Sequence, residues 1–317
     1  MAKAKREQPD RPNGSPNEVR SGKDKPPFRR GLDVRTAGML ALSCASGAAV
    51  ILGLRLALSA AFAALFLAWG VNAANVGRAP AWARWIFGSC GGVIALGASL
   101  ALTGLSALLR RLWLGEERSP MIGRPDWRAW LALAAGPVMT VMPAAVYLIL
   151  DSLRLDGGPT LSVRAPLWLI GTLIILAGEE IFTKRVIHDG VASRWGRAWA
   201  AAFAALAFFA MNGGWAGGVI GAVNTLLLGV LTALVSGGHG LWAAVALRWG
   251  WSIGTGLIFG RSSAAILRFY GVSEMALTGG DGGVMFGWGM TILLAGAILY
   301  LKGGAIKGFL HGIRKDG

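Results

Sequence analysis

The stretch Leu-Ile-Gly-Thr-Leu-Ile-Ile-Leu-Ala-Gly-Glu-Glu-Ile-Phe-Thr-Lys, residues 169–184, joins a long apolar segment to two adjacent carboxylates. It belongs to an apolar run over residues 166–187, which is close to the ~20 residues that a helix needs to cross a bilayer. Glu179 and Glu180 therefore lie late in a predicted membrane helix. Ionisable groups at membrane depth are costly, so this helix end is a candidate functional site.

Seven further apolar runs surround this one, at about residues 37–76, 85–109, 129–150, 198–212, 217–235, 240–260 and 284–301. The chain is 54% hydrophobic and only 15% charged, whereas a soluble domain has about 25% charged residues. Its mean hydropathy is +0.55. The sequence therefore predicts an all-α, polytopic transmembrane helical bundle.

Four regions follow from this pattern. Residues 1–35 are basic and polar, cannot form an apolar core, and are predicted to be a disordered cytoplasmic tail. The others are the N-terminal transmembrane helices (36–165), the segment that carries the polar motifs (166–260), and the last transmembrane helix with a basic tail (261–317). Two cysteines, Cys44 and Cys90, lie in apolar segments and are expected to be small buried residues.

The net charge of +15 comes largely from Lys and Arg in the tails and in the loops around residues 110–128 and 184–197. Such residues orient helices and bind anionic lipid, and no nucleic-acid-binding motif is visible. All the basic segments fall on the cytoplasmic side if residues 37–76 cross once, rather than as a hairpin. This predicts about eight crossings with both termini cytoplasmic, in a bacterial inner membrane.

The pair Glu179-Glu180 has two interpretations. Adjacent helical residues point about 100° apart, so the two carboxylates are expected to have different tasks. Lys184 follows Glu180 by one turn, which favours an ion pair between them and leaves Glu179 for a site. The alternative is a helix end whose charged side chains reach the membrane surface and have no further role.

Arg248 is the strongest single signal, because it lies near the middle of the run 240–260. An arginine at that depth costs at least ~2.5–3.5 kcal/mol and needs an acidic partner, for which Glu179 and Glu180 are the candidates. Ser252 lies one turn further on the same face. Asn212 ends the run 198–212 before two glycines, and is either a helix cap or a polar site residue.

These stretches resemble the three motifs of the CPBP family, membrane proteases related to the CAAX prenyl endopeptidases. The family has Glu-Glu-x-x-x-Arg, Phe-x-x-x-His and His-x-x-x-Asn. This chain has Glu179-Glu180-x-x-x-Lys184, Phe208-x-x-x-Asn212 and Arg248-x-x-x-Ser252, and the resemblance covers about residues 166–260. It implies that Glu179 would activate a water. The other catalytic positions would be Glu180, Asn212, Arg248 and Ser252, and the binding positions would be Lys184 and Phe208.

Both histidines of the family pattern are replaced here. Asn212 cannot accept a proton near neutral pH, and an arginine beside Glu179 makes it a poorer base. We therefore expect a degenerate peptidase site, without cofactor or His-based zinc, which binds a peptide or protein partner in a membrane cavity. Zinc would be expected only if the family chemistry survives. The alternatives are an active endopeptidase with Glu179 as general base, and an ion- or proton-linked transporter that uses Glu179, Arg248 and His188.

Overall fold

The computed structural model describes residues 34–68, 81–114, 125–155, 159, 165–212, 218–259, 265–267, 269–271 and 287–315. The predicted disordered tail lies outside these residues except for its last two positions. The helices are α1 (Val34–Ala68), α2 (Ala81–Leu114), α3 (Trp127–Ile149), α4 (Ala165–Glu180), η2 (Ile181–His188), α5 (Asp189–Trp195), α6 (Arg197–Met211), α7 (Gly218–His239), α8 (Leu241–Ser252), η3 (Ile253–Ile258) and α10 (Trp288–Lys315). The π-helices η2 and η3 continue α4 and α8 without a break.

Five helical segments of the described chain are long and apolar enough to cross a membrane. They are Val34–Ala68, Gly92–Leu112, Trp127–Ile149, Ala165–Trp195 and Gly218–His239. Two shorter apolar helices, Arg197–Met211 and Trp288–Gly303, accompany them. These segments confirm the predicted α-helical membrane protein, although the five long segments are fewer than the eight predicted crossings.

The first apolar run forms one continuous helix rather than a hairpin within residues 34–68. At 1.5 Å per residue the 35 residues of α1 extend over roughly 50 Å, more than the hydrocarbon thickness of a bilayer. Residues 69–76 lie outside the described part. Cys44 is exposed on α1, contrary to the expectation of a buried thiol, because α1 packs mainly on α2 and leaves much of its surface free. The side chain of Cys90 is outside the described residues.

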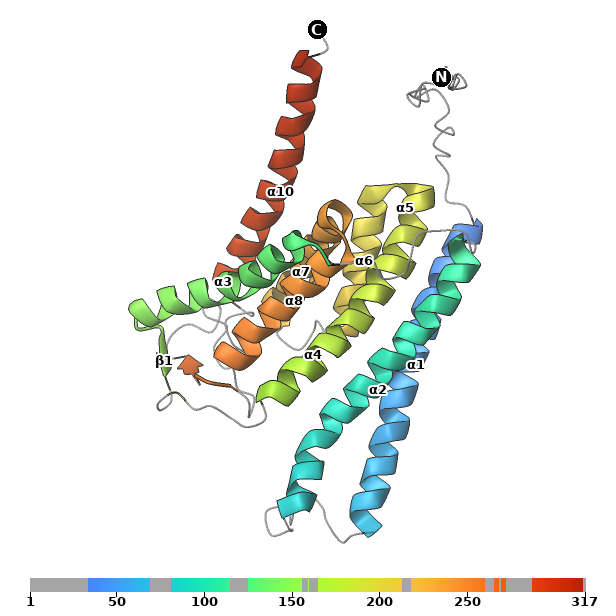
Figure 1. The fold of residues 1–317 in the computed structure, drawn as a ribbon, viewed down its shortest axis with the longest axis vertical. Coiled ribbons are helices and arrows are strands. Elements are labelled where there is room, and N and C mark those ends of the chain that lie inside the picture. Colours follow the sequence, from blue (N-terminus) through green and yellow to red (C-terminus); the bar gives the residue numbers. More distant parts are fainter. Residues whose placement is uncertain are drawn as a thin grey trace, which may run out of the picture.

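The helices form a bundle with a long hairpin on one side (Figure 1). α1 and α2 make this hairpin, and α4 lies against α2. α8 packs on α3, α7 packs on α6 and α8, and α10 packs on α7. The largest hydrophobic core lies among α3, α7, α8 and α10, and includes Leu228, Leu247, Trp251, Met290 and Leu294.

The contact between α3 and α8 brings the two backbones together. A Cβ added at Gly250 would collide with the carbonyl group of Leu133, and one added at Gly136 would collide with the backbone of Trp251. Small residues allow this close approach of membrane helices. Because Gly250 is two residues from Arg248, the contact also fixes the position of the predicted site on α8.

A short antiparallel sheet was not predicted from the sequence. β1 (Leu153–Leu155) pairs with β2 (Phe269–Gly271), with Leu153 opposite Gly271. The chain turns into β1 at Asp151, whose φ of 53° is rare outside glycine, and this residue forms an ion pair with Arg154. The sheet lies at the end of α3 and does not alter the helical class of the fold.

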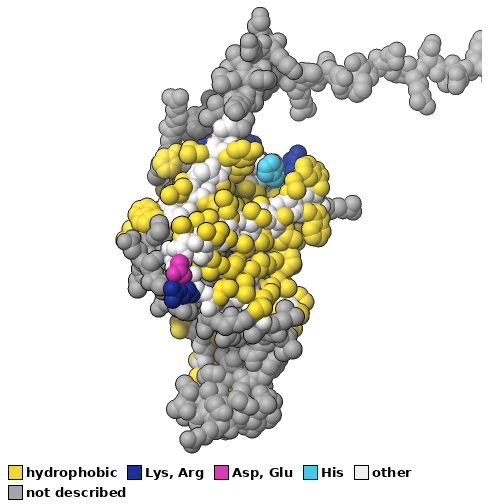
Figure 2. Space-filling model, turned by 90° about the vertical axis from the view of Figure 1, so that its left-hand side faces the viewer, with side chains coloured by type: hydrophobic (Ala, Val, Ile, Leu, Met, Phe, Trp, Pro, Cys, Tyr) yellow, Lys and Arg dark blue, Asp and Glu magenta, His cyan; other side chains and the backbone are white. Residues whose placement is uncertain are grey.

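One face of the molecule is covered by hydrophobic side chains, with the charged side chains near its ends (Figure 2). Many large apolar residues are exposed on α2, α3, α4 and α10, such as Leu100, Val138, Ile170 and Ile292. An extensive exposed apolar surface is unusual in a soluble monomer. It is the surface expected of helices that contact lipid.

Candidate functional site

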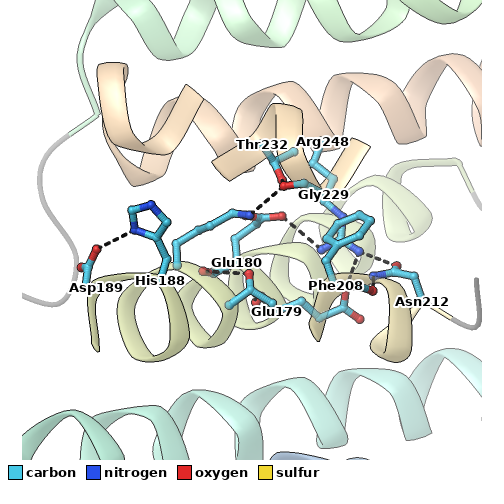
Figure 3. Close-up of polar contacts among 11 residues, drawn as sticks. Glu179, Glu180, His188, Asp189, Phe208, Asn212, Gly229, Thr232 and Arg248 are labelled. Atoms are coloured by element: carbon cyan, nitrogen blue, oxygen red, sulfur yellow. Dashed lines mark hydrogen bonds and ion pairs between the residues drawn. The ribbon is translucent and has the colours of Figure 1, made fainter. Parts of the chain in front are cut away.

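Three continuous helices, namely α4 with η2, α6 and α8, bring most of the predicted site residues together in the bundle (Figure 3). Glu179 and Glu180 end α4, Lys184 follows in η2, Phe208 and Asn212 lie at the end of α6, and Arg248 lies in α8. All four ionisable side chains are buried, with residue exposures of 9% for Glu179, 0% for Glu180 and Lys184, and 3% for Arg248. The alternative in which the charges of Glu180 and Lys184 reach the membrane surface is therefore wrong.

The guanidinium of Arg248 is the centre of the site. One terminal nitrogen, Nη2, donates to Glu179 Oε2 and to Asn212 Oδ1, the latter at 2.5 Å. The other, Nη1, donates to Glu180 Oε1 at 3.4 Å. The predicted pairing of Arg248 with the glutamates is confirmed, and it involves both of them.

The two carboxylates, which were predicted to have different tasks, share a contact with Arg248. Glu179 and Glu180 do leave α4 in different directions, but a planar guanidinium carries donors on both terminal nitrogens. Arg248 can reach one carboxylate with each nitrogen. The planar guanidinium of Arg248 thus contacts both glutamates, although adjacent residues of a helix point about 100° apart.

Lys184 supplies the second positive charge. Its Nζ lies 3.7 Å from Glu180 Oε2, as the one-turn spacing predicted, and donates to the Gly229 carbonyl of α7 at 3.3 Å. Glu180 Oε2 is buried and has no hydrogen-bond partner among the described residues. The ion pair is thus close enough for strong Coulombic attraction, without the geometry of a hydrogen bond.

Phe208 and Asn212 hold the guanidinium from α6. The ring of Phe208 lies 4.4 Å from Arg248 Cζ, within the range of a cation–π contact. Asn212 ends α6, and its backbone N–H and side-chain Nδ2 both donate to the Phe208 carbonyl, at 3.0 and 2.9 Å. The cap and the polar contact, considered as alternatives from the sequence, are both present in one side chain.

Ser252 does not join this network. It is half-buried at the end of α8 and makes no side-chain hydrogen bond to the residues that the structure describes. It lies one turn beyond Arg248, as predicted, but the long arginine side chain crosses to α4 and α6, which a serine is too short to reach. Its predicted part in a catalytic group therefore has no contact to support it.

The network is balanced in formal charge, with two carboxylates and two cations. Isolated buried charges are very unfavourable, whereas paired charges with hydrogen bonds are tolerated. The balance explains how four ionisable groups can be buried in an apolar bundle. It also means that removing any one of them leaves an uncompensated charge.

His188, at the end of η2, lies apart from Arg248 (Figure 3). It is 8% exposed, and its Nδ1 is 3.2 Å from Asp189 Oδ1. Asp189 also pairs with Arg185, at 3.3 Å. His188 is thus largely buried, and among the described residues no contact joins it to Glu179 or Arg248, the charges that the transport alternative requires.

Two features of the site gave no signal in the sequence. The eight-residue π-helix η2 begins directly after Glu180 and carries Lys184. Such helices are rare and are often found at functional sites. The other is the Gly229 carbonyl, which also accepts from Thr232 at 3.1 Å, and a backbone acceptor cannot be recognised from residue type.

Few side chains that could bind a metal ion lie close to Arg248. In the segments that the structure describes, no three His, Cys, Asp or Glu side chains lie close enough together to hold a metal ion. The groups around Arg248 are two carboxylates, an amide and an aromatic ring, and the carboxylates are in contact with cations. Their arrangement can stabilise the packing of three helices and present a polar edge at Asn212.

No protein-family model matches the chain, and no curated protein matches it.

Proposed function

We propose that this chain is a CPBP-like integral membrane protein in which the peptidase site has become a salt-bridged structural centre. It acts by binding a hydrophobic peptide or a protein partner within the membrane. The observation that carries the proposal is the position of Arg248, which contacts both Glu179 and Glu180. The three stretches that resemble the family motifs meet around this one guanidinium, which supports the resemblance.

The contacts of Glu179 support the loss of hydrolysis. A general base must accept a proton from a water within hydrogen-bond reach. Glu179 Oε2 accepts a hydrogen bond from Arg248, and the amide oxygen of Asn212 accepts from the same nitrogen. Asn212 is neutral and cannot act as a base, and the contact with Arg248 makes Glu179 a poorer base.

We expect a partner to bind at the edge of the network that is nearest the surface, beside Asn212 and Ser252. The side chain of Glu179 is 11% exposed and that of Glu180 is fully buried. Asn212 is exposed and Ser252 is half-buried. A partner that meets this edge would encounter an amide and a hydroxyl on fixed helices. Such groups suit the backbone carbonyl and amide groups of a peptide.

The proposed topology has about eight crossings and cytoplasmic termini, in a bacterial inner membrane. Beyond the five long segments, it assigns crossings to the shorter apolar helices Arg197–Met211 and Trp288–Gly303 and to α8 with η3. The first residue of α1 and the last residues of α10 lie toward the same end in Figure 1. The basic loops support a cytoplasmic position for that end.

An active endopeptidase is the second candidate. Glu179 is the more accessible of the two glutamates, and Arg248 lies where it could stabilise a developing oxyanion. Hydrolysis would require Glu179 to leave Arg248 during the reaction. This candidate differs from the first in one measurable property, which is cleavage that depends on Glu179.

A cleavage assay separates the two. The full-length protein in nanodiscs is incubated with prenylated and transmembrane peptides, and products are identified by mass spectrometry. We expect no cleavage above that of Glu179→Gln. The matched control is Asp151→Asn, which alters an exposed acid outside the network. Cleavage that Glu179→Gln abolishes and Asp151→Asn retains would establish the endopeptidase.

Binding is tested with the same peptides and a photo-crosslinking residue in place of Ser252. We expect saturable crosslinking that unlabelled peptide competes away. A crosslinker at Trp288, exposed on α10, is the control position. Crosslinking that does not saturate, or that is equal at the two positions, would contradict a binding role for this edge.

A further inference from the structure

A second surface of the molecule combines exposed tryptophans with arginines. In the first turn of α3, Trp127 is 65% exposed and Trp130 is 71% exposed. Arg128 lies between them in the sequence. Its guanidinium carbon is 5.8 Å from the centre of the Trp127 ring. In the first turn of α6, Trp199 is 60% exposed and follows the exposed Arg197.

Both first turns lie toward the same end of the bundle, the end at which α1 begins (Figure 1). Tryptophan is enriched where a membrane meets water, because its ring is apolar and its N–H is polar. Arginine at that level can bury its aliphatic stem and keep its charge among headgroups. Residues of these two kinds at one end indicate contact with the headgroup region.

The charges at these turns are predominantly positive. Asp126 is the nearby acid, and it is engaged as the cap of α3, accepting from the Arg128 backbone N–H at 3.1 Å. Its carboxylate lies 4.0 Å from the Arg128 guanidinium, at the limit of an ion pair. The described first turn of α6 contains no acidic residue. Anionic groups would complement this surface.

We propose that the first turns of α3 and α6 form a binding surface for anionic phospholipid headgroups. Trp127, Trp130 and Trp199 lie at the level of the headgroups, and Arg128 and Arg197 contact the phosphates. The surface is independent of the network around Arg248 and of the function proposed for it. Each basic side chain close to an anionic membrane strengthens the binding of the lipid by about fivefold.

The full-length protein in non-ionic detergent is titrated with phosphatidylglycerol or with phosphatidylcholine, and bound lipid is counted by native mass spectrometry. We expect tighter binding of phosphatidylglycerol, weakened about fivefold for each of Arg128→Gln and Arg197→Gln. The matched control is Arg154→Gln, whose side chain is 53% exposed and pairs with Asp151 near β1. It should leave lipid binding unchanged, and unchanged melting temperatures would show that all variants are folded.

Equal binding of the two lipids would overturn the proposal, and so would an equal loss with Arg154→Gln. Inorganic phosphate provides the remaining comparison. Retention of phosphatidylglycerol in its presence supports recognition of a lipid. Displacement by inorganic phosphate would show a simple anion site instead and would contradict a lipid-binding surface.

Discussion

Arg248 and Glu179 lie 69 positions apart in the sequence, yet a hydrogen bond from Nη2 to Oε2 joins them in the interior of the bundle. The contact ties α8 to α4 and is reinforced by Glu180 and Asn212. Neither charge could be buried alone at reasonable cost. The pair is therefore a condition for the packing of these helices, whatever else the site does.

Loss of Lys184 should destabilise the protein far more than loss of its neighbour Arg185. Lys184→Met leaves the buried network with a net negative charge, and breaking a buried pair costs ~3–5 kcal/mol. Arg185→Met is the control, because that side chain is 23% exposed and its partner Asp189 is 33% exposed. Because this pair is only partly buried, its loss should cost less than the loss of a fully buried pair. Chemical unfolding in detergent measures both, and equal losses would contradict the buried network.

Gly250→Ala should be destabilising by about 1–3 kcal/mol, since the added methyl group collides with the Leu133 carbonyl of α3. Gly171→Ala in α4 is the matched change, because nothing lies within 4 Å of the added group. Alanine also suits a helix better than glycine by about 0.5–1 kcal/mol, so this variant should be neutral or more stable. Thermal melting in detergent compares them. A stable Gly250→Ala protein would disprove the close α3–α8 contact.

Both termini should be cytoplasmic if there are about eight crossings. Fusions of a cytoplasmic reporter and a periplasmic reporter to each end measure this directly. The cytoplasmic reporter should be active at both ends, because the basic segments fix the orientation. A periplasmic C-terminus would require an odd number of crossings and would rule out the proposed topology.

Restoring the family residues should recover chemistry if the scaffold is CPBP-like. The variant combines Asn212→His, Arg248→His and Ser252→Asn, which frees Glu179 and supplies proton acceptors. We expect peptide cleavage about 10²-fold or more above the parent, a typical contribution of general acid–base groups. Adding Glu179→Gln should abolish the gain. A folded variant with no gain would count against the family resemblance.

Much of the site was predictable because charge at membrane depth is rare. Arg248 in an apolar run required an acid, and the only nearby candidates in apolar helices were Glu179 and Glu180. The one-turn spacing to Lys184 gave the second pair. These predictions rest on energetic costs that any bundle must meet, so they did not require knowledge of the helix packing.

The remaining features depend on geometry that residue type does not encode. The sharing of two carboxylates by Arg248 depends on how α8 crosses α4, and the Gly229 carbonyl is a backbone group. Ser252 was predicted from helical periodicity, which gives a shared face but not the reach of a short side chain. The exposure of Cys44 was missed because apolar segments in a membrane protein can face lipid as well as a core.

The proposed structural centre requires Arg248 to be a buried partner of Glu179, and a double-mutant cycle tests this most directly. Arg248→Met and Glu179→Gln each leave one uncompensated charge, with an expected loss of ~3–5 kcal/mol for the arginine. The double variant keeps the Glu180–Lys184 pair and is neutral. Its loss should be smaller than the sum of the single losses by roughly 1–3 kcal/mol. Arg154→Met with Asp151→Asn is the exposed control pair and should change stability little. Losses that add for Arg248 and Glu179 would show that the two side chains are not buried partners.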